Sequence, residues 1–316
     1  MSFRKFATSL AATALLTAIP LFAQNNDSQA RGKALVTVVP KAHKTGDLTA
    51  QNLSLKVDGK EASITGVTAF HNPGDRLEVV IMIDSGARTS ISTQLSDISD
   101  FIKNLPPNAK VSIGYMENGV TQLTGPLTTD HQAALKGLHI PIGIVDEDAS
   151  PYFCLSDLAK HWPSNDPGAR REVVMITDGF DYYYPSMDLQ DPYMEASIND
   201  SVRAGITVYT IYWMNKGFVS HTMYGNNVGQ NLLLEVTQAT GGNSYWEGLG
   251  NPVSFQPYFK DLMRRFQNQY EVGFTAPVPP KNRHHVVNMK LNAKGVSGKV
   301  VAPQQVYVGR PAGSLE

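Results

Sequence analysis

The chain has 316 residues, of which 42% are hydrophobic and 17% charged, which indicates a globular protein with one large domain or two to three modest ones. The formal net charge is −1 and no basic block is present, which argues against a nucleic-acid partner because phosphate binding needs a basic patch. With a single cysteine, Cys154, the chain cannot form an intrachain disulfide.

Residues 1–23 predict a secretory signal peptide. Arg4 and Lys5 precede an apolar stretch that reaches Leu21, and Phe22-Ala23 provides a cleavage point before Gln24. An uncleaved membrane anchor is the competing interpretation, but the stretch is short for a span and no second stretch reaches spanning length. We therefore expect an exported protein, periplasmic or extracellular, with no membrane span after the signal is removed.

Residues 30–72 predict a small β region. Runs rich in Val, Ile and Thr alternate with polar residues from Ala34 to Val67, with a turn at Asp58-Gly59, which indicates antiparallel strands. A turn cluster from His71 to Arg76 marks the end of this region.

Residues 76–267 predict an α/β domain. Unbroken apolar strands of the kind that is covered on both faces occur in "LEVVIMID", "REVVMITDG" and "AGITVYTIYW". Segments with helical spacing alternate with them, for example Leu95 to Leu105 and Phe255 to Phe266. This order predicts a doubly wound, mostly parallel sheet with helices on both faces, and Asn118-Gly119 adds one antiparallel edge hairpin.

Residues 268–316 return to β patterns in "YEVGFTAP", "HHVVNMKLN", "GKVVAP" and "QQVYVG". This tail can pair with the N-terminal β region to form one small sandwich or an extended sheet. The α/β domain is thus expected to be flanked by an antiparallel β region built from both termini.

Two of the buried strands end in aspartate, at Asp84 and at Asp178. Ligands of open α/β sheets bind at the carboxyl ends of the strands, and carboxylates on adjacent strand ends can hold a divalent cation. Aspartates also cap helices and turns, which is the alternative reading of each one alone. Their occurrence at two matching strand ends favours a site.

From Leu77 to Gln267 the order of elements, with Asp84 after one strand and Thr177-Asp178-Gly179 after another, resembles a von Willebrand factor type A (VWA) domain. In that family the first strand ends in Asp-x-Ser-x-Ser, a later loop adds Thr, and a further strand ends in Asp. These residues hold a Mg²⁺ that accepts a carboxylate from a protein ligand. The flanks at 35–67 and 268–277 resemble the exported bacterial "VWFA-related" proteins described from Acidobacteria.

The chain departs from this family pattern at the metal ligands. Gly86 and Arg88 stand at the serine positions and Phe153 at the threonine position, so the resemblance implies a degenerate metal site in which Asp84 and Asp178 remain. Because two close carboxylates need a neutralising charge, we expect Arg88 to pair with one or both of them in place of the metal. Arg88 projecting into solvent is the alternative. No resident cofactor is expected, with weakly held Mg²⁺ as the open alternative.

The loops after the second and third buried strands are rich in aromatic residues, which are favoured at recognition surfaces because they combine a large area with polar tips. We predict that they line a ligand surface at the carboxyl ends of the strands, although several could instead pack inward. These residues are Tyr182, Tyr183, Tyr184, Tyr193, Trp213, Phe218 and Tyr224.

Together these features predict a non-catalytic, exported binding or adhesion module that recognises a protein or other surface ligand. Two alternatives stay open. One is a metal-assisted hydrolase that uses Asp84, Asp178 and Asp181. The other is a structural component of the cell envelope without ligand binding.

Overall fold

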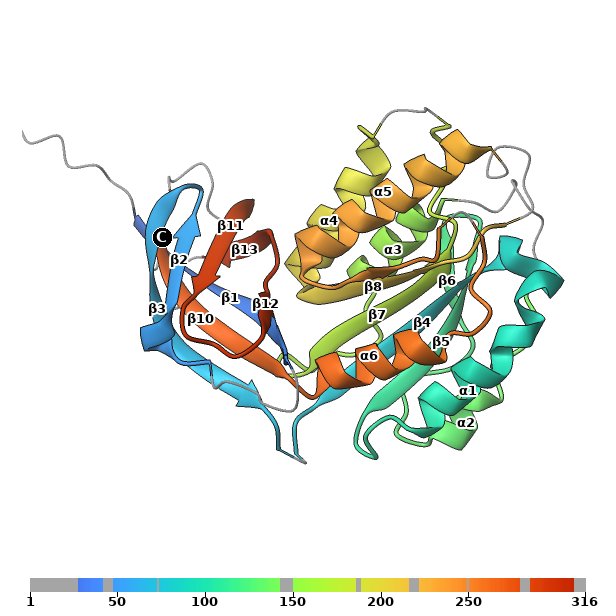
Figure 1. Cartoon of the computed structure of the whole chain (residues 1–316), viewed down its shortest axis with the longest axis horizontal. Coiled ribbons are helices and arrows are strands. Elements are labelled where there is room, and N and C mark those ends of the chain that lie inside the picture. The colour runs from blue at the N-terminus through green and yellow to red at the C-terminus, as the bar shows by residue number, and fades with distance from the viewer. Residues whose placement is uncertain are drawn as a thin grey trace, which may run out of the picture.

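The computed structural model describes residues 28–41, 48–72, 74–142, 150–185, 189–215, 222–248, 250–278 and 285–309. The chain forms two sheets: an antiparallel sheet built from both ends of the chain, and a mixed sheet covered by helices from the middle of the chain (Figure 1). The α/β class predicted for the central part is confirmed. Among the described residues, no helix combines the length and the apolar character needed to cross a bilayer.

The terminal β region is a closed barrel. Its ring of antiparallel strands runs β10-β3-β2-β11-β13-β1 and closes where β1 pairs with β10. The short β12 pairs with the end of β1, on the same side of β1 as β13. The strands are β1 (Ser28–Val39), β2 (Leu53–Val57), β3 (Lys60–Phe70), β10 (Gln269–Val278), β11 (His285–Ala293), β12 (Lys299–Val301) and β13 (Gln305–Gly309), and a 3₁₀ turn, η1 (Ala50–Asn52), precedes β2.

The barrel corrects the expectation of a sandwich or an extended sheet. Alternate residues of its strands, such as Val36, Leu55 and Phe274, meet in one buried core, and closure leaves no long unpaired edge. The predicted turn at Asp58-Gly59 is confirmed, because it joins β2 to β3 with both residues at positive φ.

The central sheet has the order β6-β5-β4-β7-β8-β9. All neighbouring pairs are parallel except β5–β6, whose hairpin turns at Asn118-Gly119 as predicted. The strands are β4 (Leu77–Asp84), β5 (Lys110–Glu117), β6 (Val120–Leu123), β7 (Arg170–Thr177), β8 (Ile206–Tyr212) and β9 (Ser244–Tyr245).

Helices cover both faces of this sheet (Figure 1). On one face α1 (Leu95–Lys103), α2 (His131–Leu135) and α6 (Gln256–Phe266) pack against residues such as Ile81, and on the other α3 (Pro151–Lys160), α4 (Pro192–Ala204) and α5 (Met223–Thr240) pack against residues such as Met82. Because β4 is buried on both faces, its sequence is an unbroken apolar run rather than an alternating one.

The barrel lies at the amino ends of the central strands. Strand β3 ends at Phe70 just before β4 begins, and α6 ends at Phe266 just before β10 begins. At this junction Arg170 donates to the carbonyl of Phe266 at 2.7 Å, and Gln269 donates to Glu172 at 2.8 Å. The carboxyl ends of the strands therefore face away from the barrel (Figure 1).

Candidate recognition site

Asp84 and Asp178 lie side by side at the carboxyl ends of β4 and β7. The two strands are parallel, and Ile83 is paired with Ile176, which places Asp84 beside Thr177. Both carboxylates are buried, with Asp84 6% exposed and Asp178 1% exposed. The sequence-based placement of these two aspartates at one edge of the sheet is thus confirmed.

Neutral donors surround the Asp84 carboxylate. Its Oδ1 accepts from the backbone N–H of Gly86 at 2.8 Å, and its Oδ2 accepts from the Thr177 hydroxyl at 2.6 Å. The side-chain amide of Asn215, three residues beyond the end of β8, donates to the same Oδ2 at 3.0 Å. These hydrogen bonds engage both oxygens of the buried carboxylate, and none of the three donors is Arg88.

Asp178 holds the loop that follows β7. Its Oδ1 accepts from the backbone N–H of Phe180 at 3.0 Å and its Oδ2 from the Tyr182 hydroxyl at 3.3 Å. The loop also packs closely on α5: a Cβ atom at Gly229 would lie 2.1 Å from the Asp178 carbonyl oxygen. Glycine at 229 therefore allows the helix to approach the aspartate turn.

The predicted contact of Arg88 with the aspartates is wrong. The Arg88 side chain is exposed, and no ion pair or hydrogen bond joins it to Asp84 or Asp178 in the part of the chain that the structure describes. Its backbone interrupts the 3₁₀ segment η2 (Ser85–Gln94) at φ 48°. The Ser85 hydroxyl donates to Glu117 at 3.3 Å.

The residues around Asp84 and Asp178 do not fit the Mg²⁺ that the VWA resemblance implies. The Asn215 amide presents N–H groups to Asp84 where a cation would need an oxygen ligand. Phe153 lies where the family has threonine, and the nearby Ser150 hydroxyl is committed as the N-cap of α3 and as a donor to Asp181 at 2.9 Å. Among the described residues, no group of three or more His, Cys, Asp or Glu side chains could hold a metal ion.

Four aromatic rings form a surface patch beside this site, here called the aromatic patch: Phe153, Tyr183, Tyr184 and Tyr193. Phe153 lies at the centre, with its ring centroid 4.4 Å from that of Tyr193 and 5.5 Å from that of Tyr183. Tyr184 meets Tyr193 edge to face at 6.2 Å. Tyr183 is 52% exposed and Phe153 36%, so the rings pack on one another and still face solvent.

The other predicted aromatic residues differ in position. Trp213 is not a surface residue: it is 3% exposed, donates to the Ser90 hydroxyl at 3.0 Å and packs edge to face on Phe255. Tyr182 is half-buried against Phe180. Tyr224 is exposed at the start of α5, and Phe218 lies outside the described residues.

Buried carboxylates position the aromatic patch. Asp181 accepts from the backbone N–H groups of Tyr183 at 2.8 Å and Tyr184 at 3.3 Å. Asp191 caps α4 and accepts from the N–H of Tyr193 at 2.8 Å. Burial raises the pKa of Asp181 to about 6, and burial likewise raises the pKa of Asp191.

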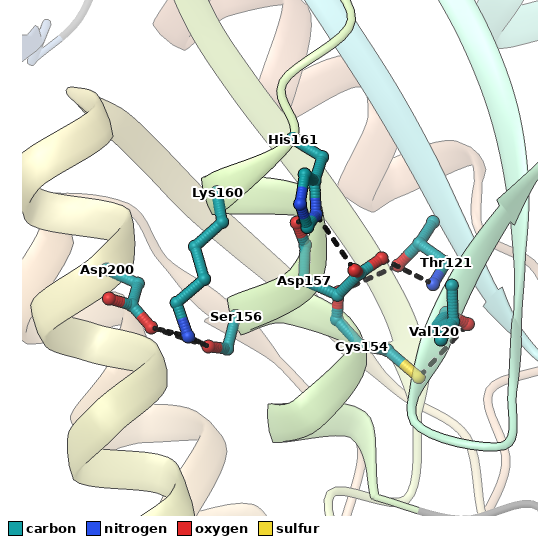
Figure 2. A network of polar contacts seen from close by, with 8 residues as sticks. All are labelled: Val120, Thr121, Cys154, Ser156, Asp157, Lys160, His161 and Asp200. Carbon is teal, nitrogen blue, oxygen red and sulfur yellow. Dashed lines mark hydrogen bonds and ion pairs between the residues drawn. The ribbon is translucent and has the colours of Figure 1, made fainter.

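Helix α3, which carries Phe153, is fixed on both sides (Figure 2). Towards β6, the Thr121 hydroxyl donates to the Cys154 carbonyl at 2.8 Å and the Cys154 thiol approaches the Val120 carbonyl at 3.4 Å. Towards α4, Lys160 pairs with Asp200 at 3.0 Å. Burial also raises the pKa of the Cys154 thiol, which keeps it protonated at neutral pH.

We use "the rim" for the described residues at the carboxyl ends of the central strands and in the helix starts beside them. The segment 139–142 belongs here because the Tyr115 hydroxyl, near the end of β5, donates to the His139 carbonyl at 2.8 Å. The rim comprises residues 84–94, 117–120, 139–142, 150–153, 178–185, 189–195, 213–215, 222–227, 245–248 and 250–256.

Exposed hydrophobic side chains are concentrated on the rim. Eleven large hydrophobic side chains among the described residues are well exposed, from 36% for Phe153 to 92% for Val253, and all eleven lie in the rim. None lies in the barrel strands. They are Val120, Ile140, Ile142, Phe153, Tyr183, Tyr184, Leu189, Met223, Tyr224, Trp246 and Val253.

No protein-family model and no curated protein matches the chain. Solved structures do. An aerotolerance-related membrane protein from Bacteroides fragilis is 16% identical over 60% of this chain and 98% of its own, with a TM-score of 0.45. The vWF domain of the type V pili tip protein Mfa5 from Porphyromonas gingivalis is 10% identical over 60% of this chain and 94% of its own, with a TM-score of 0.41.

The central domain has the order of strands and helices that the VWA resemblance predicts. The pilus adhesin SpaC from Lactobacillus rhamnosus GG is also similar, at 8% identity over 87% of this chain and 47% of its own, with a TM-score of 0.44. Because all three TM-scores are below 0.5, these likenesses carry no argument about ligand or partner. The resemblance to a VWA domain lies in this chain's own order of strands, helices and strand-end aspartates.

Proposed function

We infer that the protein is an exported, non-catalytic binding module that recognises a protein ligand through the rim, without a metal ion. One observation carries this proposal: all the well-exposed large hydrophobic side chains of the described residues lie on the rim, and none lies on the barrel. Contiguous exposed apolar surface, such as that of the aromatic patch, marks an interaction site. Aromatic side chains are also enriched where proteins recognise one another.

The chemistry of the site supports binding rather than catalysis. Cys154 is buried and its burial raises its pKa, which opposes a nucleophilic role. The Asp84 and Asp178 carboxylates accept hydrogen bonds from Thr177, Asn215 and Tyr182, so they are engaged in holding the rim loops. We therefore assign these two aspartates a structural role, in place of the metal ligation that the family resemblance implies.

A capture experiment tests the proposal. The mature chain from Gln24 is immobilised and presented with envelope and secreted proteins of the source organism, and any captured partner is identified and its affinity measured with purified components. The double variant Tyr183→Ser/Tyr184→Ser is expected to lose that partner. A control variant on exposed barrel residues, Lys60→Ser/Glu61→Ser, is expected to retain it. Equal retention by both variants would place recognition outside the aromatic patch.

Export is tested separately, by N-terminal sequencing of the protein recovered from the periplasm or medium. A mature chain that begins at Gln24 is the expected result, because the cleavage point follows Phe22-Ala23. Recovery of a full-length chain in the membrane fraction would favour the uncleaved anchor instead.

A further inference from the structure

Two buried carboxylates, Asp181 and Asp191, hold the backbone of the aromatic patch. Asp181 and Asp191 hold the backbone of Tyr183, Tyr184 and Tyr193, and each carboxylate is only 1% exposed. Neither aspartate makes an ion pair with any residue that the structure describes. Burial raises the pKa of Asp181 to about 6, which is still below neutral pH, so its carboxylate adds negative charge beside the aromatic patch.

The described rim residues carry an excess of negative charge. Within the described rim residues, Arg88 is the single lysine or arginine, and His139 is the single histidine. Against them stand seven carboxylates: Asp84, Glu117, Asp178, Asp181, Asp191, Glu195 and Glu247. An acidic ligand segment would therefore meet repulsion here, whereas a basic one would meet complementary charge.

The aromatic rings also favour a positively charged ligand. The face of an aromatic ring is negative, so an ammonium or guanidinium group that lies over a tyrosine or phenylalanine face is attracted to it. Tyr183, Tyr184 and Phe153 all present exposed ring surface for such contacts. The buried carboxylates that hold the backbone of these rings strengthen the local negative potential, because buried charges are poorly screened by solvent.

From these observations we propose that the aromatic patch binds lysine or arginine side chains of a basic protein segment. This inference rests on the proposed function and specifies the chemistry of its ligand. It is opposite in sign to the acidic ligand that a metal-bearing VWA domain accepts. The buried carboxylates that hold the patch and the excess of acidic residues on the described rim lead to the same preference for a basic ligand.

Three labelled peptides test the ligand class by fluorescence anisotropy: hexa-arginine, hexa-citrulline and hexa-glutamate. Citrulline is a neutral side chain of nearly the same shape as arginine, so it isolates the charge. We expect hexa-arginine to bind at least about tenfold more tightly than the other two, and to weaken as salt is added. Equal binding of hexa-citrulline, tighter binding of hexa-glutamate, or no binding of hexa-arginine would overturn the proposal.

Two variants locate the binding on the aromatic patch. Tyr183→Leu/Tyr184→Leu keeps apolar area but removes two ring faces, and about tenfold weaker hexa-arginine binding is expected from two exposed contacts. Asp191→Asn removes one buried charge while keeping a good helix N-cap, and severalfold weaker binding is expected. Glu61→Gln, an exposed barrel residue paired with Lys56 at 3.1 Å, makes the same charge change away from the rim and should leave binding unchanged.

The outcomes separate this inference from the proposed function. If Glu61→Gln weakens hexa-arginine binding as much as Asp191→Asn does, the attraction is general charge and the inference fails. If rim variants lose a captured protein partner while the three peptides bind alike, the rim is a binding surface and the ligand class proposed here is wrong. If Lys60→Ser/Glu61→Ser loses the captured partner and Tyr183→Ser/Tyr184→Ser retains it, the proposed function itself fails.

Discussion

The side-chain amide of Asn215 donates a hydrogen bond of 3.0 Å to the carboxylate of Asp84. Asp84 ends β4 and Asn215 follows β8, and β7 lies between these two strands in the sheet. The Thr177 hydroxyl and the Gly86 backbone N–H also donate to this carboxylate, so three neutral groups engage its two oxygens. This relationship explains how the fold accommodates a buried strand-end aspartate although the residues around it do not suit a metal.

Replacement of Asn215 by alanine should destabilise the fold. The change removes a donor from a buried carboxylate, and leaving a buried group short of a partner costs about 1–3 kcal/mol. Urea unfolding measures the loss. The control is Asn231→Ala on the exposed side of α5, where the amide donates only to the Asn227 carbonyl of its own helix. That variant should stay within about 0.5 kcal/mol of the parent, and equal losses would show that the Asn215 contact is not special.

Titration with Mg²⁺ and Mn²⁺ should give no binding heat for the parent chain. Because Arg88 is exposed and does not occupy the position between the aspartates, Arg88→Ser should be equally silent. Heat that appears only in Arg88→Ser would mean that the arginine does replace the metal in solution. Heat in the parent would mean that the aspartates bind a metal despite their present hydrogen bonds.

Asp181 should make stability depend on pH in a defined window. Burial raises its pKa from 3.8 to about 6, so folding favours the protonated carboxyl. The stability that this protonated form contributes is fully present below pH 4 and is lost as pH rises through 6. Asp181→Asn removes this dependence and keeps the side chain's hydrogen-bonding shape. Between pH 4 and pH 7 the variant should gain about 2–3 kcal/mol relative to the parent. A difference that is constant across these pH values would exclude a raised pKa.

Cys154 should not react with a thiol reagent in the native protein. The side chain is buried between α3 and β6, and burial raises its pKa, so little thiolate is present near pH 8. Reaction with a chromogenic disulfide reagent should reach one thiol per chain only in denaturing urea. Rapid reaction without urea would require α3 to leave β6 in the native state.

Much of the fold could be predicted because its signals are local. The apolar runs of β4, β7 and β8 and the Asn118-Gly119 hairpin each depend on a few adjacent residues. The barrel could not be predicted to close, because closure depends on the pairing of β1 with β10, which lie at opposite ends of the chain. Patterns within single strands do not specify such a partner.

The candidate site was only partly predictable for the same reason. Trp213 follows a strand that is buried on both faces, so no alternation of apolar and polar residues indicates which way its side chain points. In the structure its backbone N–H donates to the Thr177 carbonyl, and its side chain lies in the core. Asn215 reaches Asp84 over 131 positions with no motif around it. Phe153 first stood out as a missing threonine, and only the contacts of α3 show that it is the centre of the aromatic patch.

The central claim is that the rim binds its protein ligand through the aromatic patch without a metal. The most direct test measures the affinity of the captured partner in EDTA and in Mg²⁺, for the parent and for Tyr183→Ser/Tyr184→Ser. The account predicts equal affinity in both buffers for the parent and loss of binding in the variant. Loss of binding in EDTA with full recovery in Mg²⁺, or a variant that binds like the parent, would contradict it.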